Sequence, residues 1–184
     1  APEPENMYAP DHATWVEVPA LANTLCGLSR PIHFRGVCTV VLKLFMLAQP
    51  SLAVFGEKDW QQLAIIKKMV SDLNVPVEVV GRPIVREADG LALSSRNVYL
   101  TPEERAQAPQ IRKSLEMAAG LAAGGERDAA RIIEAVRGYL AEHLPTGEED
   151  YISIVDPAVL TKVDRIEDMA LCALAIRLGK ARLI

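Results

Sequence analysis

The 184-residue sequence has few aromatic side chains, few cysteines and little excess charge. Aromatic residues make up 5% of the chain, and the formal net charge is -4 at pH 7. A protein that binds nucleic acid needs a basic surface to neutralise the phosphate backbone, so this composition argues against a nucleic-acid partner. The three cysteines, Cys26, Cys38 and Cys172, lie far apart, unlike those of a disulfide scaffold or a zinc site. We expect reduced thiols in a cytoplasmic protein.

Long hydrophobic runs are also missing. The longest apolar stretch, residues 37–48, contains Lys43 and is shorter than the roughly 20 residues that cross a bilayer. The first ten residues, APEPENMYAP, are acidic and rich in proline, unlike a targeting peptide. We therefore expect no membrane partner. Hydrophobic residues nevertheless make up 50% of the chain, which is enough for a substantial core.

The first half of the chain alternates between helical and strand patterns. A short alternating strand is expected at residues 14–18, and residues 52–55 and 76–80 are expected to be further strands, the first of them buried. Between them, residues 59–73 predict a helix with Asp59 and Gln62 as a capping box. The helix expected within residues 36–48 has a predicted apolar face of Val37, Val40, Val41, Leu44, Phe45 and Ala48. This order is typical of a parallel sheet covered by helices.

The second half has a different organisation. It begins with an Asp-Gly turn at residues 89–90. The segment Thr101-Pro102-Glu103-Glu104 is a strong helix start, and we expect that helix to continue to Gly124. A second helix should follow Asp128, and strands are expected at residues 151–155, 170–178 and 181–184. The fold class predicted for residues 1–84 is α/β, followed by a small α+β domain over residues 85–184.

Two segments are candidates for anion binding. The first, FGEKDWQQ at residues 55–62, joins a strand end to a helix start and carries Lys58. Because ligands collect at the carboxyl ends of parallel strands, this turn could hold an anion; it could equally be a capped helix with surface charges. The second, Ser94-Ser95-Arg96-Asn97, combines two hydroxyls with a guanidinium that could clamp a phosphate. On composition alone it could also be an ordinary loop.

The remaining polar residues give weaker indications. Arg30, His33 and Arg35 precede a predicted helix and could meet an anion or form a salt-bridged anchor. His33 has no partner in the sequence that would indicate a catalytic dyad, and His12 and His143 have no metal-ligand spacing. No protein metal site is predicted.

Three strings in the sequence resemble the motifs of the pantothenate synthetase (pantoate-beta-alanine ligase) family. They are SRPIHFRGVCTVV at residues 29–41, FGEKDWQQL at 55–63 and VREADGLALSSRNVYLTPEER at 85–105. Their order and spacing match the family over essentially the whole chain. The resemblance implies a Rossmann-like domain of the HIGH nucleotidyltransferase superfamily, followed by a small C-terminal α+β domain that closes over the site.

The resemblance also implies roles for individual residues. The loop Ser94-Ser95-Arg96-Asn97 matches the family's counterpart of the KMSKS loop, which grips the ATP phosphates. Lys58 matches a phosphate-contacting lysine, so Lys58, Ser94, Ser95 and Arg96 are the implied catalytic residues. The other implied positions are Gly56 and Asp59 at the ribose, Pro83 and Val85 beside the adenine, Gln62 at pantoate, and Val37, Val40 and Val41 in the apolar wall beside pantoate.

The reaction implied by the resemblance has two steps. ATP and pantoate, with Mg²⁺, give pantoyl adenylate and pyrophosphate, and the amine of beta-alanine then attacks the adenylate to release pantothenate and AMP. The expected partners are therefore ATP, pantoate and beta-alanine, together with a second copy in a homodimer. The first step needs positive charge where pyrophosphate leaves, which is the role expected for Lys58 and Arg96 if they share one triphosphate.

The sequence departs from the family pattern in one respect. No His-x-Gly-His signature occurs in it, since its histidines are His12, His33 and His143. Loss of one transition-state donor typically costs ~100- to 1,000-fold in rate, so we expect this chain alone to make no pantothenate. We expect either part of a proteolysed intact enzyme or a fragment that associates, because the missing strands should leave an open apolar sheet edge that another chain could cover. The alternatives are a related nucleotidyltransferase and a non-catalytic module that binds ligand weakly or mediates dimerisation.

Overall fold

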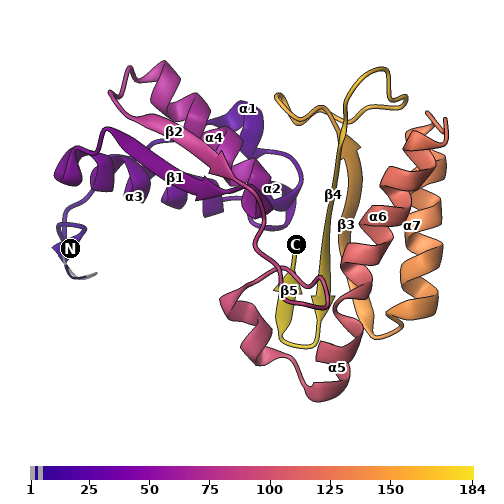
Figure 1. Cartoon of the computed structure of the whole chain (residues 1–184). Helices are drawn as coiled ribbons and strands as arrows, with labels where there is room; N and C mark the ends of the chain where they lie inside the picture. Colours follow the sequence, from indigo (N-terminus) through magenta and orange to yellow (C-terminus); the bar gives the residue numbers. More distant parts are fainter. Residues whose placement is uncertain (1–2, 4–5) are drawn as a thin grey trace. The chain divides into compact units, whose positions relative to one another are not determined.

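The computed structural model describes residue 3 and residues 6–184. The chain divides into two compact units, Ala1–Pro83 and Ile84–Ile184 (Figure 1). In order, the first unit contains α1 (Pro19–Ala22), α2 (Cys26–Ser29), α3 (His33–Ala48), β1 (Leu52–Gly56), the 3-10 helix η2 (Glu57–Asp59), α4 (Trp60–Asp72) and β2 (Glu78–Arg82). β1 and β2 form a parallel pair, in register from Leu52 opposite Glu78 to Gly56 opposite Arg82. The predicted parallel sheet with covering helices is confirmed.

The helix α3 starts earlier than its apolar pattern indicates. It begins at His33, which we expected to precede the helix, and its buried side chains are Phe34, Cys38, Thr39 and Phe45. Val37, Val40 and Val41 are half-buried, while Leu44 and Ala48 are exposed. The expected apolar face was therefore wrong. Of its six residues only Phe45 is buried, so the buried face of α3 is rotated about the helix axis from the expected one. The three-four spacing fits two adjacent stripes on α3, and packing selects the one with Phe34 and Cys38.

The strand β1 was expected to be buried, and this was wrong. Leu52 and Val54 are 47% and 55% exposed, whereas Phe55 packs edge-on against Phe45 of α3 with 6.5 Å between ring centroids. Successive side chains of a strand point to opposite faces, so one face of β1 meets the helices and the other does not. Within the described residues, β1 and β2 form a two-stranded sheet that no third strand extends.

Residues 14–18 do not form the expected strand. They have no regular secondary structure, and the amide of Val16 donates instead to Thr39 Oγ1 at 3.1 Å. A side chain of α3 thus accepts from the Val16 amide in place of a neighbouring strand. On α4, Leu63 and Ile66 are buried, whereas Leu73, the last residue of the expected helix, lies past its end and is 50% exposed.

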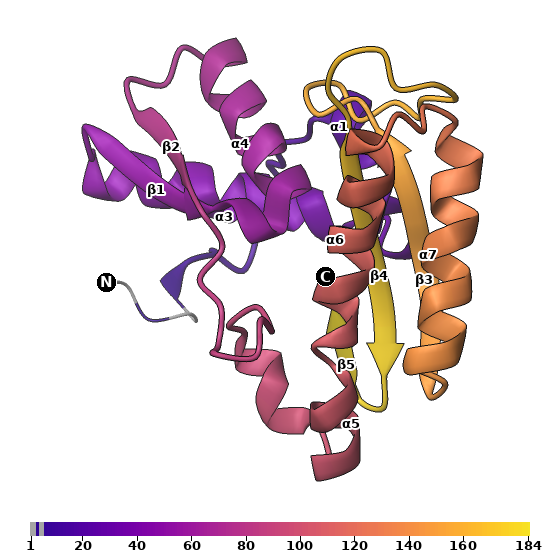
Figure 2. The same cartoon turned by 45° about the vertical axis from the view of Figure 1, so that its right-hand side comes forward.

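The second unit is an antiparallel sheet with helices against it. It contains the 3-10 helix η3 (Ser95–Tyr99), α5 (Pro102–Gln107), α6 (Gln110–Ala123), α7 (Ala129–His143), β3 (Gly147–Val155), β4 (Leu171–Leu178) and β5 (Ala181–Leu183). The strand order is β3-β4-β5. In Figures 1 and 2, α6 and α7 run side by side along the sheet. The expected small α+β organisation is confirmed.

Capping explains where the helices of the second unit begin. Thr101 and Glu104 form the predicted capping box at the start of α5, and Asp128 caps α7 by accepting from the amides of Ala130 and Arg131. The single helix expected up to Gly124 is instead two helices. Pro109, the N-cap position of α6, has no amide to donate to the preceding turn and separates α5 from α6.

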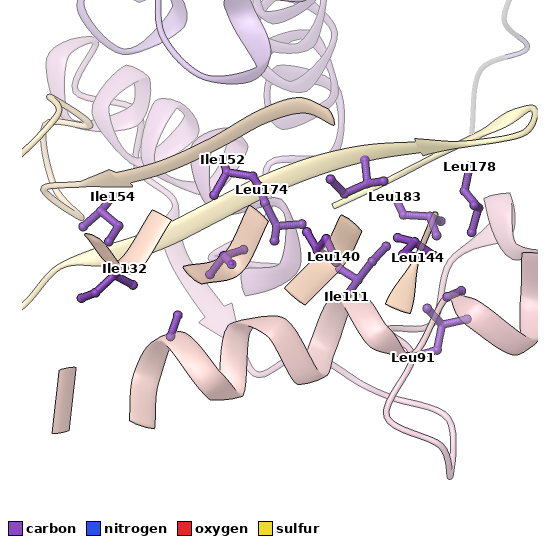
Figure 3. Close-up of a cluster of buried hydrophobic side chains, with 14 of the residues drawn as sticks. Leu91, Ile111, Ile132, Leu140, Leu144, Ile152, Ile154, Leu174, Leu178 and Leu183 are labelled. Atoms are coloured by element: carbon purple, nitrogen blue, oxygen red, sulfur yellow. The ribbon is translucent and has the colours of Figure 1, made fainter. Parts of the chain in front are cut away.

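The core of the second unit lies between the sheet and the two long helices. Ile132 and Leu140 of α7 meet Ile154 and Leu174 of the sheet in Figure 3. Leu91, which immediately follows the Asp-Gly turn, belongs to the same cluster. This contact ties the loop segment 86–97 to the folded body of the unit. No helix in the part of the chain that the structure describes is both long and apolar enough to span a membrane.

Candidate functional site

The turn that follows β1 is the first candidate site. Gly56 ends the strand in an extended conformation, with φ -77° and ψ 136°, and is exposed. A Cβ added there would have no neighbour within 4 Å. Neither the backbone conformation nor internal packing therefore requires glycine at this position. The space next to its Cα is open to a ligand.

Lys58 lies next in this turn, within η2. Its side chain is 19% exposed, and Nζ is 3.8 Å from Asp59 Oδ2. Asp59 occupies the N-cap position of α4, but its side chain makes no capping hydrogen bond, so the expected capping box with Gln62 is wrong. The 3-10 turn leads directly into α4 and leaves Asp59 with φ -95° and ψ 59°, away from the extended conformation of a capping residue.

Gly81 of β2 allows this turn to lie close to the sheet. A Cβ at Gly81 would come within 2.9 Å of Leu63 Cδ2 and 3.1 Å of Glu57 Oε1. Any larger residue would displace one of these side chains. Glu57 directly precedes Lys58, so close packing at the end of β2 helps to set the position of the lysine.

Gln61 is a structurally important residue that sequence reasoning missed. It is 7% exposed, and Nε2 donates to the carbonyls of Leu21 at 2.8 Å and Thr24 at 2.7 Å. Oε1 accepts from the amide of Cys26 at 3.0 Å. The signal available was a pair of adjacent glutamines at a helix start, of which we assigned a role only to Gln62. Gln62 is half-buried, on the neighbouring face of α4.

The expected apolar wall lies on α3. Val37, Val40 and Val41 are all half-buried there, and α3 packs against α4. Gln62 and the three valines thus belong to neighbouring helices of the same unit. The half-burial of the valines leaves part of each side chain accessible to a ligand.

The second candidate site is the loop of residues 94–97 in the second unit, which we call the serine-arginine loop. Ser94 caps η3, since its Oγ accepts from the amide of Arg96 at 3.2 Å. Ser95 is exposed, and Arg96 donates through Nη1 to the carbonyl of Arg182 in β5 at 3.2 Å. One guanidinium N–H is used in this contact. The loop is an ordered turn with both hydroxyls and the arginine on consecutive residues.

Pro83 and Val85 lie on either side of the boundary between the units. Pro83 is the last residue of the first unit, while Val85 belongs to the second. Both are exposed, Val85 to 65%. The carbonyl of Val85 accepts from the amide of Leu93 at 2.9 Å, which places it opposite the start of the serine-arginine loop.

Among the other polar candidates, Arg35 fits an anchoring role. Arg35 is 3.6 Å from Glu17 and lies over the ring of Trp15, 4.8 Å from its centroid. The salt-bridged anchor is the alternative that these contacts favour. The described residues contain no cluster of three or more histidine, cysteine or acidic side chains that could hold a metal ion. They do not form a magnesium cage, and Mg²⁺ commonly binds through substrate phosphates instead.

These features define an α/β protein with a second, α+β unit. A helix-covered parallel pair of strands carries Lys58 in the turn after β1, and the second unit carries the serine-arginine loop. The chain belongs to the pantoate-beta-alanine ligase family, whose model matches residues 1–184. The resemblance found in the motifs is therefore confirmed.

Several relatives are similar over the whole chain. The pantothenate synthetase of Nitratidesulfovibrio vulgaris strain Miyazaki F is 67% identical over 183 residues, and that of Thermotoga neapolitana is 52% identical. In each comparison the match covers 100% of this chain and 65% of the relative. The chain thus spans just under two-thirds of the length of these relatives.

Solved structures are also similar over nearly the whole chain. The pantothenate synthetase of Thermus thermophilus has a TM-score of 0.92 and 46% identity, covering 97% of this chain and 64% of that one. The pantoate-beta-alanine ligase of Francisella tularensis has a TM-score of 0.68 and 30% identity, covering 95% and 58%. The latter structure is described as a complex with beta-gamma ATP and beta-alanine.

Proposed function

We propose that this chain supplies the nucleotide-gripping part of an ATP-dependent ligase that joins pantoate to beta-alanine. The observation that carries the proposal is the match of the family model along all 184 residues, including both candidate loops. The ATP and beta-alanine named for the Francisella tularensis relative support the same substrates here.

In the proposed reaction, a carboxylate oxygen of pantoate attacks the α-phosphorus of ATP. The bond between that phosphorus and the bridging oxygen breaks, and pyrophosphate leaves with the bonding electrons. The beta-alanine nitrogen then attacks the acyl carbon of the adenylate, AMP leaves, and the nitrogen loses a proton. Negative charge builds up on the leaving pyrophosphate in the first step, so cationic groups aimed at it lower the barrier.

Lys58 and the serine-arginine loop are the groups that we assign to that charge. Lys58 offers an ammonium in the turn after β1, and its ion pair with Asp59 is long, at 3.8 Å. Arg96 has further N–H donors besides the one on the Arg182 carbonyl, and Ser94 and Ser95 add hydroxyls. Gly56 and Asp59 are proposed for the ribose, Pro83 and Val85 for the adenine, and Gln62 with Val37, Val40 and Val41 for pantoate. Mg²⁺ would enter with the triphosphate.

We also propose that the first unit is the nucleotide-binding domain and the second a lid that excludes water from the adenylate. Acting alone, the chain is expected to give no pantothenate, because its sequence contains no His-x-Gly-His pair. The homodimer and the cytoplasmic location remain expectations of the same proposal.

Isotope exchange between pyrophosphate and ATP tests this function. The chain should be assayed with and without pantoate, beside the Thermotoga neapolitana enzyme as the active reference. We expect pantoate-dependent exchange in the reference and none in the chain alone, although the chain should still bind ATP weakly in calorimetry. Exchange by the chain alone at the rate of the reference would refute its inactivity. Absence of heat with both ATP and pantoate would leave only a structural role, such as dimerisation.

A further inference from the structure

The serine-arginine loop is held in place through the side chain of Asn97. Its Nδ2 donates to Glu87 Oε1 at 3.0 Å and to the carbonyl of Ala92 at 3.1 Å. Both partners are acceptors, so the amide has only one favourable orientation. The residue beside Arg96 is therefore fixed to the segment that carries the Asp-Gly turn.

Glu87 is in turn held by an arginine on a helix. Its second oxygen, Oε2, accepts from Arg105 Nη2 at 2.6 Å, and Arg105 Nη1 donates to Asp89 Oδ2 at 2.6 Å. One guanidinium thus bridges the two carboxylates of the turn. Asp89 Oδ1 also accepts from the amide of Leu91 at 3.1 Å. The Arg105 guanidinium beside Asp89 holds the pKa of that carboxyl below its usual range.

The position of Arg105 is itself fixed by hydrogen bonds. It lies in α5, whose start is fixed by the Thr101–Glu104 capping box, and its amide donates to the carbonyl of Thr101 at 2.8 Å. The loop is held on its other side as well, since Arg96 contacts the carbonyl of Arg182. The side chain of Arg182 is paired with Asp150, and both are nearly buried, at 13% and 11% exposure.

We propose that Arg105 is a positioning residue for the triphosphate, which it does not touch: through Glu87 and Asn97 it holds Ser94, Ser95 and Arg96 in the geometry that grips phosphate. This inference rests on the proposed function of the loop. A preorganised loop loses less conformational entropy when an anion binds, so removal of the support weakens phosphate binding without removing any phosphate ligand.

The structure offers a matched control for this effect. Arg137 makes an equally good two-point pair with Glu149, at 2.8 Å and 2.7 Å, in the same unit. That pair joins α7 to β3, whereas the serine-arginine loop is held by the turn, α5 and β5. Both arginines are partly exposed, at 30% and 48%, so neither replacement by alanine should unfold the unit.

The test uses NMR on the full chain and the variants Arg105→Ala, Arg105→Lys and Arg137→Ala. Without ligand, the amides of Arg96 and Asn97, which hydrogen bond to Ser94, should exchange about tenfold faster in Arg105→Ala than in the parent chain. Arg105→Lys, which keeps the charge and can reach one carboxylate, should recover part of the protection. Arg137→Ala should leave both amides unchanged. Unchanged exchange in Arg105→Ala, or equal acceleration in Arg137→Ala, would overturn the positioning role.

Titration with tripolyphosphate separates this inference from the function on which it rests. We expect the amides of residues 94–97 to shift in the parent chain and in Arg137→Ala, with affinity about tenfold lower in Arg105→Ala. No shift in the parent chain would contradict phosphate binding by the loop, whereas the exchange result would still decide whether Arg105 orders it. Equal affinities in the parent and Arg105→Ala chains would overturn the positioning role.

Discussion

The side-chain amide of Gln61 donates to the backbone carbonyl of Thr24 at 2.7 Å, across 37 residues of sequence. Together with its contacts to Leu21 and Cys26, this bond fastens the start of α4 to the segment between α1 and α2. That segment needs support, because Leu25 within it has a φ of 46°. The same helix start carries Lys58 and Gln62, so Gln61 links the stability of the first unit to its candidate site.

Replacement of Gln61 by leucine should destabilise the first unit by about 2 kcal/mol, because the carbonyl of Leu21 and the amide of Cys26 each lose the hydrogen bond to its side chain. The carbonyl of Thr24 still accepts from the amide of Gly27. Trp15 and Trp60 are the only tryptophans and both lie in the first unit, so urea unfolding followed by tryptophan fluorescence reports on it. Gln62→Leu is the matched control and should cost about 0.5 kcal/mol or less. Equal losses in the two variants would contradict the assigned role of Gln61.

Gly56→Ala should separate ligand binding from stability. The backbone at Gly56 is extended and a Cβ meets nothing within 4 Å, so the unfolding midpoint should not fall. If ATP approaches the backbone here, the methyl group should lower ATP affinity about tenfold, which corresponds to about 1.4 kcal/mol. Calorimetry with ATP on both chains makes the comparison, and equal affinities would remove Gly56 from the site.

Gly179→Ala should destabilise the second unit by about 1–3 kcal/mol. Gly179 has φ +54° in the turn between β4 and β5, and a Cβ there would collide with the carboxylate of Glu104. Gly120→Ala is the control with the opposite sign. Gly120 lies inside α6 with no neighbour near its Cβ, so alanine should stabilise the helix by about 0.5–1 kcal/mol. Thermal unfolding followed by circular dichroism measures both, and a stable Gly179→Ala chain would show that the turn adapts.

Alkaline pH should weaken the first unit through Cys38. Burial raises the pKa of this thiol to about 11, from an ordinary value of 9.0. As pH rises through this window the unfolded chain loses the thiol proton first, so the free energy of unfolding falls between pH 9.0 and about 11. Cys38→Ala should begin less stable but show a shallower fall in tryptophan-detected urea midpoints. Cys172→Ala, in the second unit, should leave that slope unchanged; identical slopes in all three chains would refute the assignment.

The sequence predicted the order of elements well, because caps and breakers act locally. Thr101 with Glu104 and Asp128 mark helix starts through hydrogen bonds within one turn, and the structure has both. The misplaced face of α3 has a different cause. Its apolar residues exceed what one face can hold, so tertiary contacts decide that Phe34 is buried and Leu44 exposed.

The sequence indicated the residues that we propose to face the ligand, and it did not indicate the residues that support them. Lys58 and Arg96 belong to motifs whose residue types indicate phosphate chemistry. Gln61 and Arg105 act through partners 35 to 40 and 16 to 18 residues away, respectively, and no local pattern signals such contacts. Position-specific support of this kind depends on the fold, which brings distant segments together.

Lys58 and Arg96 are each proposed to bind the triphosphate of ATP, and the proposed function depends most on this claim. The direct test is an ATP titration of the chain and of its Lys58→Ala variant, following the backbone amide resonances of Lys58 and Arg96. We predict that both resonances shift in the parent chain, and that Lys58→Ala binds ATP more weakly. Unchanged ATP affinity in Lys58→Ala, or a response at only one of the two residues, would contradict the claim.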